Sequence, residues 1–80
     1  MDEQIRELTL LLLYLTSWTE KEYGDETQRA WKGYDFGVLD SLRDEKLIGG
    51  NSYKSKSTYL TESGINKAKE LIRKYNINEE

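Results

Sequence analysis

Carboxylates are the side chains of this sequence with the clearest potential for chemistry. The 80-residue chain contains no Cys and no His, which excludes disulfide and thiolate chemistry, imidazole catalysis and most zinc sites. Asp40 and Asp44 are one helical turn apart, a spacing suited to an acid/base pair or an oxygen-coordinated metal. Their neighbours do not predict a buried pocket that would shift a carboxyl pKa, so we expect surface residues that pair with Arg43 or nearby lysines.

The glycine and serine residues give no sign of a catalytic or phosphate-binding motif. The spacing of the six glycines fits no phosphate loop, and no serine lies in a nucleophile-elbow sequence. We therefore expect no enzymatic activity, no catalytic or metal-binding residue and no cofactor.

Nucleic-acid contact is the next chemistry to consider, and the candidate residues are Arg29, Lys32, Tyr53, Lys54 and Lys56. Lysine and arginine bind phosphates, and an exposed tyrosine can stack on a base or a sugar. An alternative of equal weight is that the lysines only keep an exposed hairpin soluble and unpaired with its neighbours.

The two tryptophans, Trp18 and Trp31, allow two interpretations. An exposed Trp31 beside Arg29 and Lys32 would form a contact site for a protein partner or for nucleic acid. Tryptophan in so small a chain is more often buried, so we expect both rings to close the space between the first helix and the helix that begins at Asp35. Arg29 and Lys32 would then be charges at the rim.

The elements that must position these residues form one domain over residues 1–80, mainly α-helical with a small β-hairpin (α+β). Apolar spacing predicts helices over residues 1–18, 35–46 and 61–76, and the composition of residues 47–60 predicts a hairpin. Asp35 and Thr61 are the expected N-caps of the second and third helices. Residues 19–33 are predicted to be a loop followed by a short helical turn.

This order of elements, in which residues 47–49 join a helix directly to a hairpin, is that of a winged helix-turn-helix domain. Residues 38–48, with Leu60-Thr61-Glu62-Ser63-Gly64 after the wing, resemble the recognition helix, wing and following helix of MarR- and PadR-type regulators. That resemblance implies a DNA-binding or regulator-like accessory role. A wider pattern is similar to a small bacterial family of single-domain proteins of unknown function, and its segments are residues 8–18, 29–36 and 54–61.

The charge distribution bears on the DNA hypothesis in two ways. The net charge of −3 argues against a uniform basic field, but residues 1–46 carry a balance of −5 and residues 47–78 a balance of +4. The helix before the wing would point Asp40 and Asp44 outward, and two carboxylates facing phosphates argue against insertion into the major groove. The alternative function is a homodimeric protein-interaction module that binds an unidentified protein partner and no nucleic acid.

The first predicted helix is apolar on two faces. Ile5, Leu8, Leu11, Leu12 and Leu15 form the stripe that we expect to face the core, and Leu10 and Leu13 lie almost opposite with Tyr14 beside them. We expect a second copy of the chain to cover Leu10, Leu13 and Tyr14 in a homodimer. The alternative is that the C-terminal helix of the same chain covers them.

The longest apolar run, residues 10–13, bears on localisation. It is too short to span a bilayer and follows an acidic rather than a basic N-terminus, so it indicates neither a transmembrane helix nor a signal peptide. We expect a cytoplasmic protein without a membrane partner.

Overall fold

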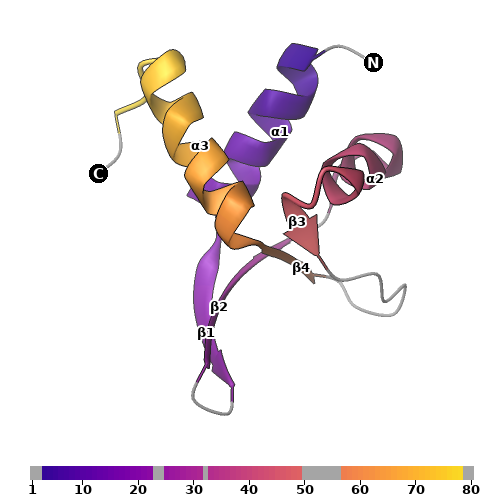
Figure 1. Ribbon diagram of the computed structural model, residues 1–80, viewed down its shortest axis with the longest axis vertical. Helices are drawn as coiled ribbons and strands as arrows, with labels where there is room; N and C mark the ends of the chain where they lie inside the picture. The colour runs from indigo at the N-terminus through magenta and orange to yellow at the C-terminus, as the bar shows by residue number, and fades with distance from the viewer. Residues whose placement is uncertain (1–2, 23–24, 32, 50–56, 79–80) are drawn as a thin grey trace.

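The computed structural model describes residues 3–22, 25–31, 33–49 and 57–78 (Figure 1). These residues form three helices and one four-stranded antiparallel sheet, which confirms the predicted α+β fold. In chain order the elements are α1 (Glu3–Leu15), β1 (Trp18–Glu22), β2 (Asp25–Trp31), α2 (Phe36–Asp44), β3 (Ile48–Gly49), β4 (Ser57–Leu60) and α3 (Glu62–Lys74).

The three predicted helices are present, each slightly shorter than expected. Both described caps are confirmed: the Asp35 carboxylate accepts a hydrogen bond from the Val38 amide at 3.2 Å, and the Thr61 hydroxyl accepts one from the Gly64 amide at 2.9 Å. These contacts satisfy amide groups that have no partner within the first turn of a helix. None of the helices in the described residues combines the length and apolar character that crossing a membrane requires.

Residues 18–22 and 25–31 form two paired strands, so the predicted loop and short helical turn are wrong for these residues. Strands β1 and β2 pair antiparallel from Trp18 opposite Arg29 to Glu22 opposite Asp25. Aromatic and β-branched residues in both runs favour strands, and the two residues between Glu22 and Asp25 match the commonest hairpin spacing. A strand, not a helix, therefore precedes α2. From α2 to α3 the described elements follow the predicted order of helix, two paired strands and helix, but ahead of α2 a pair of strands stands where a loop and a short helical turn were predicted.

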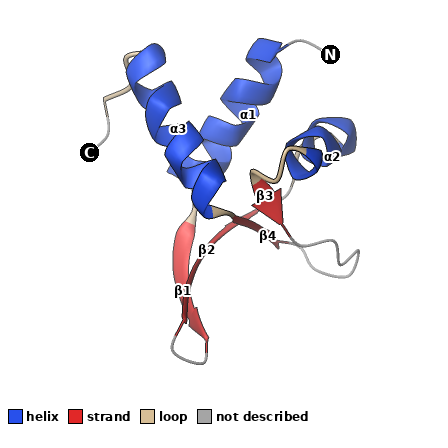
Figure 2. Cartoon of the chain, in the orientation of Figure 1, coloured by secondary structure: helices blue, strands red, loops and turns tan. Residues whose placement is uncertain are grey.

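The sheet has the strand order β1-β2-β4-β3, which places β2 and β4 at its centre. In the segment 47–60, predicted to be a hairpin, the described residues form the antiparallel strands β3 and β4, with Ile48 opposite Leu60 and Gly49 opposite Tyr59, and residues 50–56 lie outside the described residues. The helices gather on one side of the sheet, and the β1–β2 hairpin extends away from them (Figure 2). This arrangement leaves part of the sheet outside the helical layer.

The core lies between the three helices and one face of the sheet. Burying apolar residues between two layers is the usual way in which a domain of this size forms a core. Its main residues come from every helix and from strands β2, β3 and β4, and they are Leu10, Leu13, Ala30, Leu39, Leu42, Ile48, Leu60 and Leu71.

A close backbone contact joins the first turn of α3 to the turn after α2. The Thr61 amide donates to the Leu47 carbonyl at 3.1 Å, and the Thr61 hydroxyl donates to the Lys46 carbonyl at 2.7 Å. A Cβ atom on Gly64 would overlap the Leu47 carbonyl oxygen. The Leu-Thr-x-x-Gly sequence therefore has a structural role here, because it lets α3 begin directly against this turn.

Candidate functional site

Four large aliphatic side chains are exposed along one face of α1. Ile5, Leu8, Leu12 and Leu15 keep between 40% and 51% of their surface accessible. Their spacing of three, four and three residues is that of the seam between two packed helices. We call these four residues the α1 stripe.

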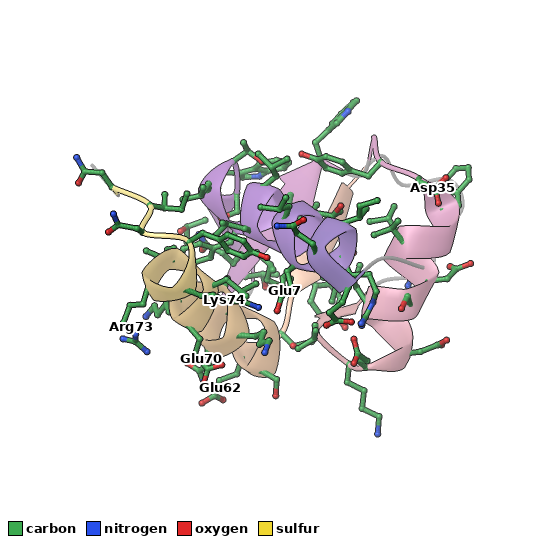
Figure 3. All side chains as sticks on the ribbon, turned by 90° about the horizontal axis from the view of Figure 1, so that it is seen from above. Glu7, Asp35, Glu62, Glu70, Arg73 and Lys74 are labelled. Atoms are coloured by element: carbon green, nitrogen blue, oxygen red, sulfur yellow. The ribbon has the colours of Figure 1, made fainter. Side chains whose placement is uncertain are left out.

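The predicted interface of Leu10, Leu13 and Tyr14 lies on the wrong face of α1. Leu10 and Leu13 are 1% and 0% exposed, and Tyr14 is half-buried against the same core. The alternative interpretation, in which the C-terminal helix of the same chain covers this face, agrees with the packing of α1 against α3. Seen from above, α1 lies between α3 and α2 (Figure 3).

Glu7 lies on the face of α1 that meets α3. Its carboxylate is buried, and it accepts hydrogen bonds from Lys74 Nζ at 2.8 and 3.0 Å and from the Tyr75 hydroxyl at 2.7 Å (Figure 3). The hydrogen bond from Lys74 is the main reason that the pKa of Glu7 is lowered. The same contacts with Glu7 raise the pKa of Lys74 and of Tyr75. Because Glu7 is one helical turn from Leu10 and Leu11, this link directs both leucines inward.

The other charged residues of α1 are also paired within the chain. Arg6 Nη1 lies 2.6 Å from Glu3 Oε2, and Arg6 Nη2 pairs with Glu45 at the end of α2. All three charged residues of Glu3–Leu15 therefore have intramolecular partners. A second chain that packs on the α1 stripe does not have to desolvate an unpaired charge.

The sheet face opposite the helices carries aromatic rings around Arg29. Trp18 lies opposite Arg29 on β1, and Tyr59 lies opposite Arg29 on β4, so all three side chains share one face. Trp31 is two residues further along β2 and points to the same side. The three rings keep 38% to 56% of their surface exposed. We call Trp18, Arg29, Trp31 and Tyr59 the aromatic sheet face.

The expected burial of Trp18 and Trp31 is therefore wrong. Strand β2 turns Ala30 into the core, so its neighbours Arg29 and Trp31 point to the other side of the sheet. The alternative interpretation, an exposed tryptophan beside a cation, describes Trp31 and Arg29 better. Residues 27–31 show no alternation of polar and apolar side chains, so the sequence carried no periodic signal for this arrangement.

Two glycines allow the rings of this face to lie against the backbone. A Cβ atom on Gly49 would overlap the Tyr59 ring, so this ring lies across the neighbouring strand β3. A Cβ atom on Gly33 would lie 3.0 Å from Trp31 Nε1. Each ring thus lies close to the backbone of a glycine.

The structure places one of the five predicted nucleic-acid contacts. Arg29 lies on the aromatic sheet face, and the remaining four are outside the described residues: Lys32, Tyr53, Lys54 and Lys56. On α2, Asp40 and Asp44 are exposed as expected, and Asp40 pairs with Arg43 at 2.7 Å. The outer face of α2 is therefore acidic.

A cleft of about 240 Å³ opens between the three helices. Its apolar lining includes Leu10, Leu42 and Leu71, and its polar lining includes Arg6 and Glu45, which pair with each other. Pockets that hold cofactors or drug-sized ligands usually exceed about 300 Å³. Within the described ranges, no three potential ligand residues lie close enough together to hold a metal ion.

Comparisons with known proteins add a family and one relative. The family described as "Domain of unknown function (DUF6429)" matches residues 1–78. The uncharacterized protein y4hR of Sinorhizobium fredii (strain NBRC 101917 / NGR234) is 36% identical over 73 residues, which cover 91% of this chain and 89% of that protein. No solved structure matches the chain. The family description and the relative's name state no activity and no ligand.

Proposed function

The chain belongs to the DUF6429 family of unknown function, and we propose that it is a homodimeric protein-interaction module whose two copies pair through the α1 stripe. The observation that carries this proposal is the row of four exposed aliphatic side chains on a helix whose charges are all paired elsewhere. Contiguous exposed apolar surface of this kind is typical of association sites. The proposal assigns the protein no catalytic role.

A second copy of the chain is the partner that this surface fits best. The positions beside the stripe are uncharged in the sequence, and they are Gln4, Thr9, Leu11 and Thr16. In paired helices, charged residues at such flanking positions determine which helix is chosen as the partner and whether the two helices run parallel or antiparallel. Two identical stripes can therefore face each other without like-charge repulsion, as a two-fold symmetric interface requires.

The energetics favour a reversible dimer. Burial of the exposed half of one Leu or Ile side chain is worth about 1 kcal/mol, so two stripes supply about 8 kcal/mol. Association costs about 4–15 kcal/mol in lost translational and rotational freedom. The gain and the cost are of similar size, so the proposed dimer should dissociate on dilution rather than form a permanent assembly.

Sedimentation velocity over a range of protein concentrations tests this proposal. We expect the parent chain to shift from monomer to dimer as its concentration rises, and Leu8→Glu/Leu12→Glu to remain monomeric because it places carboxylates on the stripe. The matched control Ser63→Glu/Asn66→Glu adds two carboxylates at exposed positions of α3 and should dimerise like the parent. Circular dichroism confirms that each variant is folded. A parent chain that stays monomeric at millimolar concentration contradicts the proposal.

Nucleic-acid binding, as a DNA-binding or regulator-like accessory factor, is a second candidate function. The observation in its favour is the position of Arg29 among three exposed rings, since rings and cations together bind single strands. The exposed Asp40 and Asp44 argue against insertion of α2 into a major groove.

Titration with mixed-sequence duplex and single-stranded DNA at low and physiological salt tests the second candidate. If nucleic acid binds, the affinity should fall with added salt, and Lys54→Glu/Lys56→Glu and Arg29→Glu should weaken it further. Absence of any salt-dependent binding by the parent removes this candidate.

A further inference from the structure

We propose that the aromatic sheet face binds an extended, proline-rich segment of a partner protein. This site is separate from the α1 stripe, so the inference goes beyond the proposed dimer and does not depend on it. It would give the module a ligand of defined chemistry, in addition to a way of pairing.

The composition of the face is the first argument. Trp, Tyr and Arg are the residues that contribute most often to the binding energy of protein interfaces. Both tryptophans of the chain lie here, on β1 and β2, and the Tyr59 ring lies on the same face of the sheet, over Gly49 of β3. Surfaces lined with exposed Trp and Tyr rings recognise proline-rich segments, because the polyproline II helix is already extended before it binds.

The spacing of the strands is the second argument. Trp18 and Tyr59 start from strands that are two positions apart in the sheet, with β2 between them. The Cα positions of these two residues are two strand spacings apart, and the Tyr59 ring lies one strand further away, over Gly49 of β3, which puts it about 14 Å from the Trp18 position. A polyproline II helix advances by about 3.1 Å per residue, so about four to five residues span this distance. A segment of this length that crosses the strands therefore reaches both aromatic positions, and it passes over Arg29 between them.

Arg29 suits the carbonyl groups of such a ligand. A proline-rich segment keeps its backbone carbonyls unpaired, because polyproline II has no internal hydrogen bonds. The guanidinium group has five N–H donors, so it can donate to a ligand carbonyl and also keep a contact within the protein. Arg29 lies beside both Trp18 and Tyr59, at the position where the ligand crosses β2.

An open groove lies at the edge of the site, where β2 extends past the end of β4. The pairing of β2 with β4 begins at Gln28, and the three residues Asp25–Thr27 pair with β1 alone. The groove has a volume of about 450 Å³, and its lining combines residues of the outer sheet face with residues of the helix side: Thr27, Arg29 and Tyr59, and then Gln28, Leu60 and, from α3, Ile65. The ligand can leave the aromatic rings between β2 and the first turns of α3 without meeting another strand.

Charge favours a peptide over a nucleic acid as the occupant. In sequence, β1 and β2 carry four acidic and two basic residues, and the whole chain has a net charge of −3. Single-stranded nucleic acids bind where cations line the path of the phosphates. A proline-rich peptide has no phosphates, so its binding site does not need a row of cations. The chain itself contains no proline, so the ligand must come from another protein.

Tryptophan fluorescence with a decaproline peptide tests this inference. Both tryptophans of the protein lie on the proposed site, so the emission reports on this face alone. We expect saturable binding of decaproline and no response to a Gly-Ser decapeptide. Tyr59→Ala should weaken the binding at least tenfold, whereas Phe36→Ala, an exposed aromatic at the start of α2, should leave it unchanged. Amide shifts in an NMR titration should map to β2 and β4.

The dimer-breaking variant separates this inference from the proposed function. Leu8→Glu/Leu12→Glu should bind decaproline as the parent does, even where it no longer dimerises. A parent that gives no saturable response to decaproline at millimolar concentration overturns the inference. Amide shifts confined to α1, or a response to deca-thymidine in place of decaproline, also overturn it.

Discussion

Glu7 links α1 to α3 because two side chains of the C-terminal segment donate to its carboxylate. Lys74 and Tyr75 both contact this group, which is 8% exposed. Sequence periodicity identified two apolar faces on α1, and its assignment of the Ile5 and Leu8 face to the core is wrong. The partners of Glu7 are almost 70 residues away in the chain, so this contact could not be inferred from spacing within one helix.

The Glu7 link predicts a pH-dependent part of the stability. The pKa of Glu7 is lowered below its ordinary value of 4.5 in the folded state, so its contribution is complete above that value and is lost as the pH falls through the folded-state pKa. In urea unfolding, the parent should exceed Glu7→Gln in free energy of unfolding at pH 7, and the difference should shrink below pH 4.5. Lys74→Met should reduce the same pH dependence. A difference that stays constant from pH 7 to pH 3 contradicts this account.

Gly64 is the second residue whose role depends on a distant contact. Its missing side chain allows α3 to pack against the Leu47 carbonyl. We expect Gly64→Ala to lower the free energy of unfolding by about 1–3 kcal/mol, because the added methyl group forces the turn and the helix apart. Ser63→Ala, at the adjacent exposed position, should change it by less than about 0.5 kcal/mol. Urea unfolding of the two variants measures both values, and equal stabilities would contradict the close contact.

At the level of elements, the helices were predictable and the first hairpin was not. Apolar spacing together with the capping residues Asp35 and Thr61 located α2 and α3 closely. The charged residues between Trp18 and Trp31 suggested a loop, so the sequence did not predict strands β1 and β2. These strands belong to the sheet because β2 pairs with β4, a contact between distant parts of the chain. The same omission hid the aromatic sheet face, since Trp18 and Tyr59 become neighbours only across β2.

The cap of α3 gives a prediction at this level. Thr61 accepts a hydrogen bond from the Gly64 amide and donates to the turn after α2. Thr61→Ala removes both contacts, so we expect a loss of about 1–2 kcal/mol in the free energy of unfolding. Thr61→Ser keeps the hydroxyl and should recover most of this loss. Urea unfolding tests the pair, and equal losses in the two variants would show that the hydroxyl is not responsible.

At the level of the whole molecule, one helix connects the core to the proposed interface. The sequence indicated that α1 has more apolar surface than a single chain of this size can bury, and it suggested pairing of two copies. The three- and four-residue spacing of the α1 stripe was interpreted as core, which is the reverse of its exposure. Of the stripe that was expected to face the core, Leu11 alone is buried. Leu10 and Leu13 face the other two helices and the sheet, and the α1 stripe remains exposed.

Reversible pairing predicts that thermal stability depends on protein concentration. A second copy that binds only the folded chain stabilises it by mass action, so the melting temperature of the parent should rise with concentration. The melting temperature of Leu8→Glu/Leu12→Glu should be independent of concentration. Differential scanning calorimetry over a hundredfold range of concentration measures this effect. A parent melting temperature that does not change contradicts the proposed dimer.

The central claim is that two copies meet through the α1 stripe, and an isotope-filtered NOE experiment tests it most directly. A mixture of ¹³C-labelled and unlabelled chains at millimolar concentration gives filtered signals only from protons that lie on different chains. The account predicts such signals for the methyl groups of Ile5, Leu8, Leu12 and Leu15, and none for those of Leu10 and Leu13. Absence of signals from the stripe, or signals from Leu10 and Leu13 in its place, would contradict it.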